Sequence, residues 1–283
     1  MLVLGLTGDV GAGKTTVASL WEAAGASIVD ADRIVRSLWR NSSVISMAAA
    51  RWGEDILDPS GIPIPAAIAS RAFKNREEYR WLCSLLHPLV RIEMERQIAS
   101  LEGWVVAEIP LLFESGVPEW IDAVVYVTAP EEFRTRRNLG RGWDEEEIRR
   151  RESFLLPREE KKTRSRMVID NDGTLEELHA SVGELGAFFR RAASIVRCTA
   201  LFREREKAEE LGVLLKERRL CSGFFREGGG NQREHAWMAS FFTREEFFPL
   251  VASLADSAPH LWMDRIRRMP YERRLSILEE LVR

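Results

Sequence analysis

Residues 8–15 read Gly8-Asp9-Val10-Gly11-Ala12-Gly13-Lys14-Thr15 and match the pattern G-x-x-x-x-G-K-[ST] in full. Glycines let such a loop curl so that its amides point at one phosphate group, and the dipole of the following helix adds to the attraction. The lysine of the pattern reaches the β- and γ-phosphates, and the hydroxyl after it ligates Mg²⁺. We therefore expect residues 8–15, with Thr16 beside them, to bind ATP, and Thr15 to contact the metal.

The neighbours of this loop are those that a phosphate-binding loop requires. Residues 2–7 form a short apolar run, and residues 14–24 favour a helix that stops at Gly25. A chance match in a glycine-rich turn would lack this strand and helix. The loop alone does not separate kinases from ATPases or GTPases.

Four more apolar runs alternate with charged, helix-favouring stretches. They are residues 27–29, 104–109, 123–127 and 167–169. Strands that alternate with helices predict an α/β domain with a parallel, doubly wound sheet. Ligands of such sheets bind beyond the carboxyl ends of the strands. We expect the strand at residues 27–29 to lie next to the first strand.

The pattern changes after Ala193. Apolar runs and amphipathic stretches then follow in the order β-α-β-β-α-β, which is the order of a ferredoxin-like domain. The sequence therefore predicts a P-loop domain at residues 1–193 and a smaller α+β domain at residues 194–283. The expected strands are residues 194–202, 220–225, 236–243 and 261–269, with helices at 203–219 and 244–255.

The composition is that of an ordinary globular protein. Of 283 residues, 45% are hydrophobic and 30% are charged, and the net charge of −3 gives no electrostatic reason to bind nucleic acid. The three cysteines share no metal-ligand spacing, which favours a reducing compartment. No apolar run approaches the length of about 18 residues that a membrane-spanning helix needs. We expect a cytoplasmic protein that binds neither nucleic acid nor membranes.

Two carboxylates, Asp30 and Asp32, follow the second predicted strand. A carboxylate at a strand end can accept the proton of an attacking hydroxyl or hold Mg²⁺ through water. Because strand residues alternate in facing, the two side chains could point the same way. The alternative is that Asp30 caps a helix that begins near Arg33.

Five blocks of sequence resemble the dephospho-CoA kinase family, in the family's order and over residues 1–190. Members of that family phosphorylate the ribose 3′-hydroxyl of dephospho-CoA with MgATP. The resemblance thus implies a P-loop kinase fold and this reaction. The blocks are residues 7–16, 28–35, 85–90, 109–114 and 168–171.

The resemblance also implies roles for individual residues. Asp32 is the expected general base, and Lys14 the expected catalytic cation. Glu108, at a strand end, is a candidate Mg²⁺-linked carboxylate, and Glu114 a candidate site residue. Arg136 and Arg141 fall in the family's lid, Asn171 near the adenine of ATP, and His87, Pro110 and Leu111 at the acceptor substrate.

Three positions depart from the family's pattern. Asp9 stands where the family usually has glycine, which puts a carboxylate next to the phosphate-binding loop. Ala12 replaces a serine, and Leu155 replaces a glutamine. These changes leave Lys14 and Asp32 in place but bear on nucleotide affinity.

The second predicted domain resembles the start of the divalent-ion-tolerance (CutA) family, whose members form trimers. The matching residues are Val196-Arg197-Cys198-Thr199, the helix at 207–219 and Leu220-Cys221. The resemblance implies a homotrimer. Two alternatives to dephospho-CoA kinase activity stay open: another small-substrate P-loop kinase, for a nucleoside or nucleotide, and a nucleotide-gated sensor without enzymatic activity.

Overall fold

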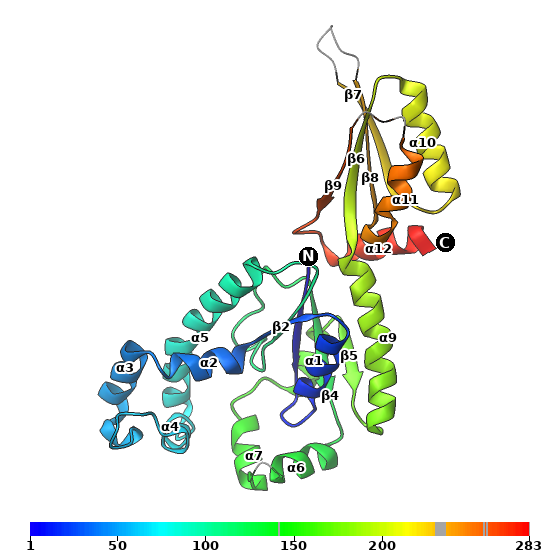
Figure 1. Ribbon diagram of the computed structural model, residues 1–283. Helices are drawn as coiled ribbons and strands as arrows, with labels where there is room; N and C mark the ends of the chain where they lie inside the picture. The colour runs from blue at the N-terminus through cyan, green and yellow to red at the C-terminus, as the bar shows by residue number, and fades with distance from the viewer. Residues whose placement is uncertain (141, 230–235, 257, 259, 283) are drawn as a thin grey trace. The chain divides into compact units, whose positions relative to one another are not determined.

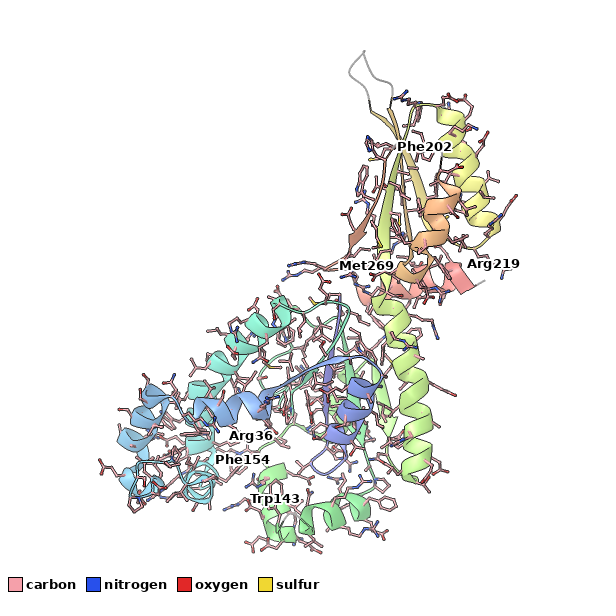
Figure 2. The ribbon with its side chains drawn as sticks, in the orientation of Figure 1. Arg36, Trp143, Phe154, Phe202, Arg219 and Met269 are labelled. Carbon is pink, nitrogen blue, oxygen red and sulfur yellow. The ribbon has the colours of Figure 1, made fainter. Side chains whose placement is uncertain are left out.

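The computed structural model describes residues 1–140, 142–229, 236–256, 258 and 260–282 (Figures 1 and 2). The chain forms two compact units. The larger comprises Val3–Leu101 and Val105–Gly183, and the smaller comprises Met1–Leu2, Glu102–Trp104 and Glu184–Arg283.

A five-stranded parallel sheet in the order β2-β3-β1-β4-β5 forms the centre of the larger unit (Figure 1). Every residue of β1, β3 and β4 is buried, as in a sheet covered on both faces. All five predicted strands are therefore present, and the α/β fold with a parallel sheet is confirmed. The strands are β1 (Leu2–Gly8), β2 (Ser27–Asp30), β3 (Trp104–Glu108), β4 (Ala123–Thr128) and β5 (Met167–Asp170).

One expectation about the sheet is wrong: β2 does not lie next to β1. Strand β3 lies between them, and Asp30 of β2 is in register with Glu108 of β3. Strand order depends on contacts between distant segments, so the local pattern of the first two strands does not encode it. The carboxyl ends of β1, β2 and β3 consequently meet at one edge, with Glu108 in the middle.

Nine helices accompany this sheet in the described residues. Trp21 of α1 donates a hydrogen bond from Nε1 to the carbonyl of Val182 in α9 at 2.9 Å, which packs these two helices together. The helices are α1 (Lys14–Ala23), α2 (Ala31–Leu38), α3 (Ser42–Trp52), α4 (Pro65–Ala72), α5 (Arg76–Ala99), α6 (Glu131–Leu139), α7 (Glu145–Glu152), α8 (Arg158–Arg164) and α9 (Leu175–Ala193), with a 3₁₀ turn at Glu54–Ile56.

The smaller unit has a four-stranded antiparallel sheet in the order β7-β8-β6-β9. Helices α10 and α11 cover one face (Figure 1), and Phe202, labelled in Figure 2, is buried in the core between them and the sheet. The predicted β-α-β-β-α-β order is present. The elements are β6 (Ile195–Phe202), α10 (Arg205–Glu217), β7 (Ser222–Gly229), β8 (Ala236–Arg244), α11 (Phe248–Leu254) after a 3₁₀ turn at Glu245–Phe247, β9 (His260–Arg265) and α12 (Tyr271–Val282).

The chain passes from one unit to the other within α9, between Gly183 and Glu184. The predicted boundary at Ala193 coincides with the end of that helix and stays a prediction. Within the described ranges, the helices are all too short or too polar to cross a bilayer.

Candidate nucleotide and acceptor site

The loop between β1 and α1 needs glycine at three positions for steric reasons: Gly8, Gly11 and Gly13. Gly8 has φ 150°, and a Cβ there would lie 2.0 Å from the carbonyl oxygen of Val127. Gly13 has φ 100°, and a Cβ there would lie 2.5 Å from Nδ2 of Asn171. L-amino acids with side chains rarely adopt such angles. The glycine spacing of the motif therefore reflects this close approach to β4 and to the loop after β5.

Lys14 is half-buried and donates hydrogen bonds from Nζ to two carbonyls of its own loop, Gly8 at 3.1 Å and Asp9 at 2.9 Å. Burial lowers the pKa of Lys14 to about 8, while the charges of Glu108, Asp32 and Asp9 act in the opposite direction. The ammonium group is thus held at the loop by neutral acceptors that phosphate oxygens could replace.

Thr15, the first residue after this lysine, points to the end of β3. Its hydroxyl donates a hydrogen bond to Oε1 of Glu108 at 3.0 Å. Glu108 is only 7% exposed, and burial raises the pKa of its carboxyl group, although the hydrogen bond from Thr15 opposes this. Thr16 is exposed. The structure thus brings together two of the predicted metal-site residues, which are 93 positions apart in the sequence.

Asp30 and Asp32 have different positions and different roles. Strand β2 ends at Asp30, whose Oδ1 accepts a hydrogen bond from the backbone N–H of Arg33 at 3.1 Å and caps α2. Asp32 lies in the first turn of that helix, so the expectation based on strand alternation is wrong. Partial burial raises the pKa of the Asp32 carboxyl group, as does the charge of Asp30, and the charges of Lys14 and Arg36 oppose the shift.

A cavity of about 320 Å³ lies between α2, α5 and the loop after β3. It brings together all four residues predicted to bind the acceptor: Asp32, His87, Pro110 and Leu111. Burial lowers the pKa of His87 and so favours the neutral imidazole. The negative charge of Glu114 acts in the opposite direction. Most of the other lining is apolar and includes Val35, Pro88, Met94, Ile109, Pro118 and Trp120.

The arginine that contacts the phosphate-binding loop in this structure is not one of the two predicted lid arginines. Arg137 contacts the phosphate-binding loop, because its Nη1 donates to the carbonyls of Gly11 at 3.2 Å and Ala12 at 3.3 Å. Arg136 is exposed and lies over the ring of Phe133. Arg141 falls outside the described residues. The helical phase of α6 could have indicated Arg137, since it adjoins the buried face of Arg134 and Asn138, whereas its neighbour points away.

Asn171, expected near adenine, lies against the loop itself. Its Nδ2 donates a hydrogen bond to the carbonyl of Ala12 at 2.8 Å. This contact explains why residue 13 must be glycine. The proposed contact with adenine stays a prediction.

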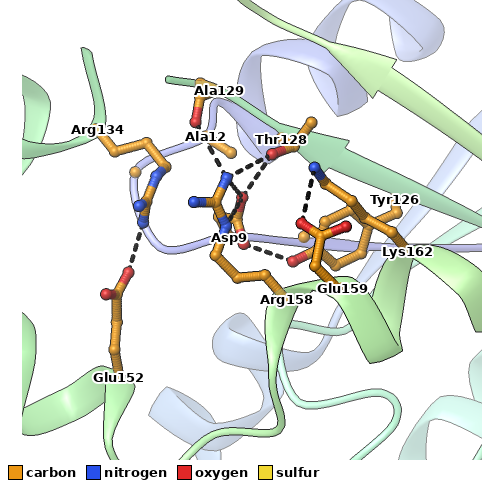
Figure 3. Close-up of polar contacts among 12 residues, drawn as sticks. Asp9, Ala12, Tyr126, Thr128, Ala129, Arg134, Glu152, Arg158, Glu159 and Lys162 are labelled. Atoms are coloured by element: carbon orange, nitrogen blue, oxygen red, sulfur yellow. Dashed lines mark hydrogen bonds and ion pairs between the residues drawn. The ribbon is translucent and has the colours of Figure 1, made fainter. Parts of the chain in front are cut away.

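The carboxylate of Asp9 faces polar side chains of β4 and α8 (Figure 3). It is buried and accepts hydrogen bonds from Tyr126 and Thr128 of β4 and from Arg158 at the start of α8. None of these three donors was predicted from the sequence. Tyr126 and Thr128 were detectable as polar groups at i and i+2 of a buried strand, but nothing local distinguishes Arg158 from its many basic neighbours.

Glu114 also joins distant segments. It accepts hydrogen bonds from the backbone N–H of Leu156 at 3.1 Å and from Nζ of Lys161 at 3.4 Å. Lys161 is buried, so this is an ion pair removed from water. Leu155, which replaces a glutamine of the family, precedes this contact in the segment before α8.

A model of one protein family, described as "Dephospho-CoA kinase", matches residues 2–177, which is more than half of the chain. The chain belongs to the dephospho-CoA kinase family. A dephospho-CoA kinase from Corynebacterium diphtheriae is 40% identical over 191 residues, which cover 65% of this chain and 96% of that protein. One from Deinococcus radiodurans is 38% identical and covers 66% of this chain and 91% of its own length.

Solved structures agree with the fold of this family. The crystal structure of TT1252 from Thermus thermophilus is 31% identical with a TM-score of 0.51, covering 66% of this chain and 97% of that one. Dephospho-CoA kinase from Campylobacter jejuni is 22% identical, with a TM-score of 0.50. The match covers 65% of this chain and 94% of that chain, and it supports the fold. The model of the dephospho-CoA kinase family ends at residue 177, before the smaller unit's sheet begins.

Proposed function

We propose that the larger unit transfers the γ-phosphoryl group of ATP to the ribose 3′-hydroxyl of dephospho-CoA, which yields coenzyme A and ADP. The observation that carries this proposal is the position of Asp32. Asp32 lines the same cavity as the other predicted acceptor residues. Its negative charge also raises the pKa of Lys14 in the phosphate-binding loop. A proton acceptor and a phosphate-binding cation therefore serve the same reaction centre.

The transfer forms a bond between the ribose oxygen and the γ-phosphorus and breaks the bond to the β–γ bridging oxygen. Asp32 takes the proton of the attacking hydroxyl, and its raised pKa makes it a stronger base than an exposed aspartate. Lys14 stays with the β- and γ-phosphates and stabilises their charge. In phosphoryl transfer the protein contributes mainly such alignment and charge stabilisation.

Mg²⁺ fits the residues at the end of β3. Magnesium prefers oxygen ligands and is usually held by one or two protein groups together with water and substrate phosphates. The Thr15 hydroxyl and the Glu108 carboxylate, 3.0 Å apart, are such groups. When bound, the metal neutralises charge on the transferred phosphate. A protein-only cluster of three or more His, Cys, Asp or Glu ligands does not occur in the described ranges.

The remaining nucleotide contacts in this proposal are Arg136 and Arg141 of the lid and Asn171. We add Arg137, because it already lies on the loop carbonyls. His87, Pro110 and Leu111 form the wall against which the acceptor binds. A neutral His87 suits contact with the uncharged part of the substrate.

An ADP-release assay on the purified protein tests the function. We expect ADP release that depends on dephospho-CoA, and little or none with nucleosides or nucleoside monophosphates as acceptors. Activity with one of those acceptors in place of dephospho-CoA would favour another small-substrate kinase. ATP binding without transfer to any acceptor would favour the sensor.

For the smaller unit we propose a ferredoxin-like fold at residues 194–283. Its support is the β-α-β-β-α-β order with an antiparallel sheet ordered β7-β8-β6-β9. The CutA-like relationship and a homotrimer are proposals with the same support, and a cytoplasmic location rests on the cysteine content. Light scattering of the full chain and of a chain ending at Ala193 tests the trimer. A monomer in both would end that idea.

A further inference from the structure

A buried carboxylate inside a phosphate-binding loop is unexpected, because the loop's ligand is an anion. Asp9 is 3% exposed, and its two oxygens accept hydrogen bonds from the Tyr126 hydroxyl and from Thr128 Oγ1 at 2.6 Å (Figure 3). These hydroxyls solvate the carboxylate but do not neutralise it. An uncompensated buried charge is strongly unfavourable.

Arg158 supplies the positive charge. Its Nε donates to Oδ2 of Asp9 at 3.0 Å, and its Nη2 also donates to Thr128 Oγ1 at 3.0 Å and to the carbonyl of Ala129 at 3.4 Å. Arg158 is the first residue of α8. The guanidinium group therefore joins three segments: the phosphate-binding loop, the end of β4 and the start of α8.

The negative charge of Asp9 acts electrostatically on Lys14, the residue expected to bind phosphate. Nζ of Lys14 donates to the backbone carbonyl of Asp9 at 2.9 Å, so the phosphate-binding cation is at the same residue. The Asp9 carboxylate also raises the pKa of Lys14, against the effect of burial. A negative charge that acts on the lysine acts on a bound triphosphate too, with the opposite sign.

We propose that Arg158 is a positioning residue for the nucleotide: it neutralises Asp9 and holds the phosphate-binding loop against β4, so that the loop binds a triphosphate without repulsion. The inference rests on the proposed function only in taking ATP as the nucleotide. It makes Asp9 and Arg158 a matched pair, in which the buried carboxylate of Asp9 requires the charge of the partly exposed Arg158.

Equilibrium binding of ATP, measured by calorimetry without an acceptor, tests this pair. The proteins are the full-length chain and its Arg158→Gln, Asp9→Asn and doubly substituted variants. We expect Arg158→Gln to weaken ATP binding by on the order of tenfold, the effect of one like charge roughly 10 Å away at an effective dielectric constant near 20. The double variant should bind within about threefold of the wild type, and Asp9→Asn at least as tightly as the wild type, because only the repulsive charge has been removed.

A merely structural role predicts a different pattern, in which both single variants lose affinity and the double variant is no better. That result would overturn the proposal, as would wild-type affinity in Arg158→Gln. Arg149→Gln, which breaks an exposed ion pair of α7, is the matched control and should bind ATP normally. If ATP binds with the expected pattern but dephospho-CoA is not phosphorylated, the proposed function fails and the inference about Arg158 stands.

Discussion

At the scale of single residues, Lys14 and Asp32 have opposite pKa shifts with the same main cause. Burial disfavours the charged form of both, so the pKa of the lysine falls and that of the aspartate rises. Each group is therefore closer to exchanging a proton at neutral pH than an exposed group of its kind. The raised pKa suits Asp32 as a base that accepts a hydroxyl proton, whereas the lowered pKa of Lys14 restricts its phosphate-binding cationic form to pH values below about 8.

ATP affinity should fall as the pH rises through about 8, the pKa of Lys14. Below that pH the lysine is protonated and pairs with phosphate; above it the free protein loses the charge, and affinity drops by up to about tenfold per pH unit. Calorimetric ATP binding from pH 7 to 9.5 measures this. Lys14→Arg, which stays charged, is the control and should lack the decline. A flat wild-type profile would contradict the assignment.

The same shift affects stability with the opposite sign. Between about pH 8 and the ordinary lysine pKa of 10.5, the unfolded chain binds more protons at Lys14 than the native protein does. The contribution of this residue to the free energy of unfolding therefore increases with pH across that window.

Asp32→Asn should lower kcat by on the order of 10²–10⁴-fold, the usual range for loss of a general base. The amide has the same shape but cannot accept the proton of the ribose hydroxyl. ATP binding should change little, because Asp32 lines the acceptor cavity. Steady-state ADP release and calorimetric ATP binding together check both parts. An active Asp32→Asn variant would refute the role of the base.

At the scale of elements, α8 is attached to the loop after β3 by one buried ion pair. Lys161 and Glu114 side chains are 3% and 12% exposed, and Glu114 also accepts from the backbone of Leu156. Its second oxygen, Oε2, has no hydrogen-bond partner among the described residues. If Lys161 is removed, the buried Glu114 carboxylate therefore keeps only the hydrogen bond from the backbone of Leu156 among these contacts.

Lys161→Met should lower the free energy of unfolding by about 3 kcal/mol, because it leaves the buried Glu114 without its positive partner. Arg149→Gln, which removes one half of an exposed pair with Glu145, should change it by less than about 1 kcal/mol. Urea unfolding followed by circular dichroism compares the two. Equal effects would show that the buried pair contributes no more than a surface pair.

At the scale of the whole molecule, two separate cores suggest two unfolding events. The larger unit is built on the parallel sheet, and the smaller has its own cluster of buried apolar residues around Phe202 and Phe241. Chains with two cores often depart from two-state behaviour. The nucleotide site belongs to the larger unit alone.

Scanning calorimetry should therefore show two unfolding transitions, and ATP should raise the midpoint temperature of only one of them. At a free ATP concentration of about 100 times Kd, the stabilisation is about 2.7 kcal/mol. A chain that ends at Ala193 should retain the ATP-sensitive transition and lose the other. A single transition that shifts as a whole would show that the two units unfold together.

The local sequence determined the phosphate-binding loop, the positions of the strands and the helix α1 that follows the loop. Gly8, Gly13 and Lys14 lie within seven consecutive residues, and each of the strands β1, β3 and β4 is one contiguous run of buried residues. The resemblance to a family then placed Asp32, His87 and Pro110 around one acceptor, and the cavity contains them all. The loop and the strands can be predicted because their physical cause lies in a few neighbouring residues, whereas the grouping of Asp32, His87 and Pro110 came from the family resemblance alone.

Only the tertiary structure decided how distant segments meet at the loop. It placed β3 between β1 and β2, turned Arg137 rather than Arg136 to the loop carbonyls, and paired Asp9 with Arg158 across 149 positions. The strand order and the pairing of Asp9 with Arg158 depend on packing and charge compensation between segments with no local signal, whereas the helical phase of α6 could have indicated Arg137. The phosphate-binding loop was evident from its own eight residues, but the neutralisation of its carboxylate was not, because the compensating charge comes from the start of another helix.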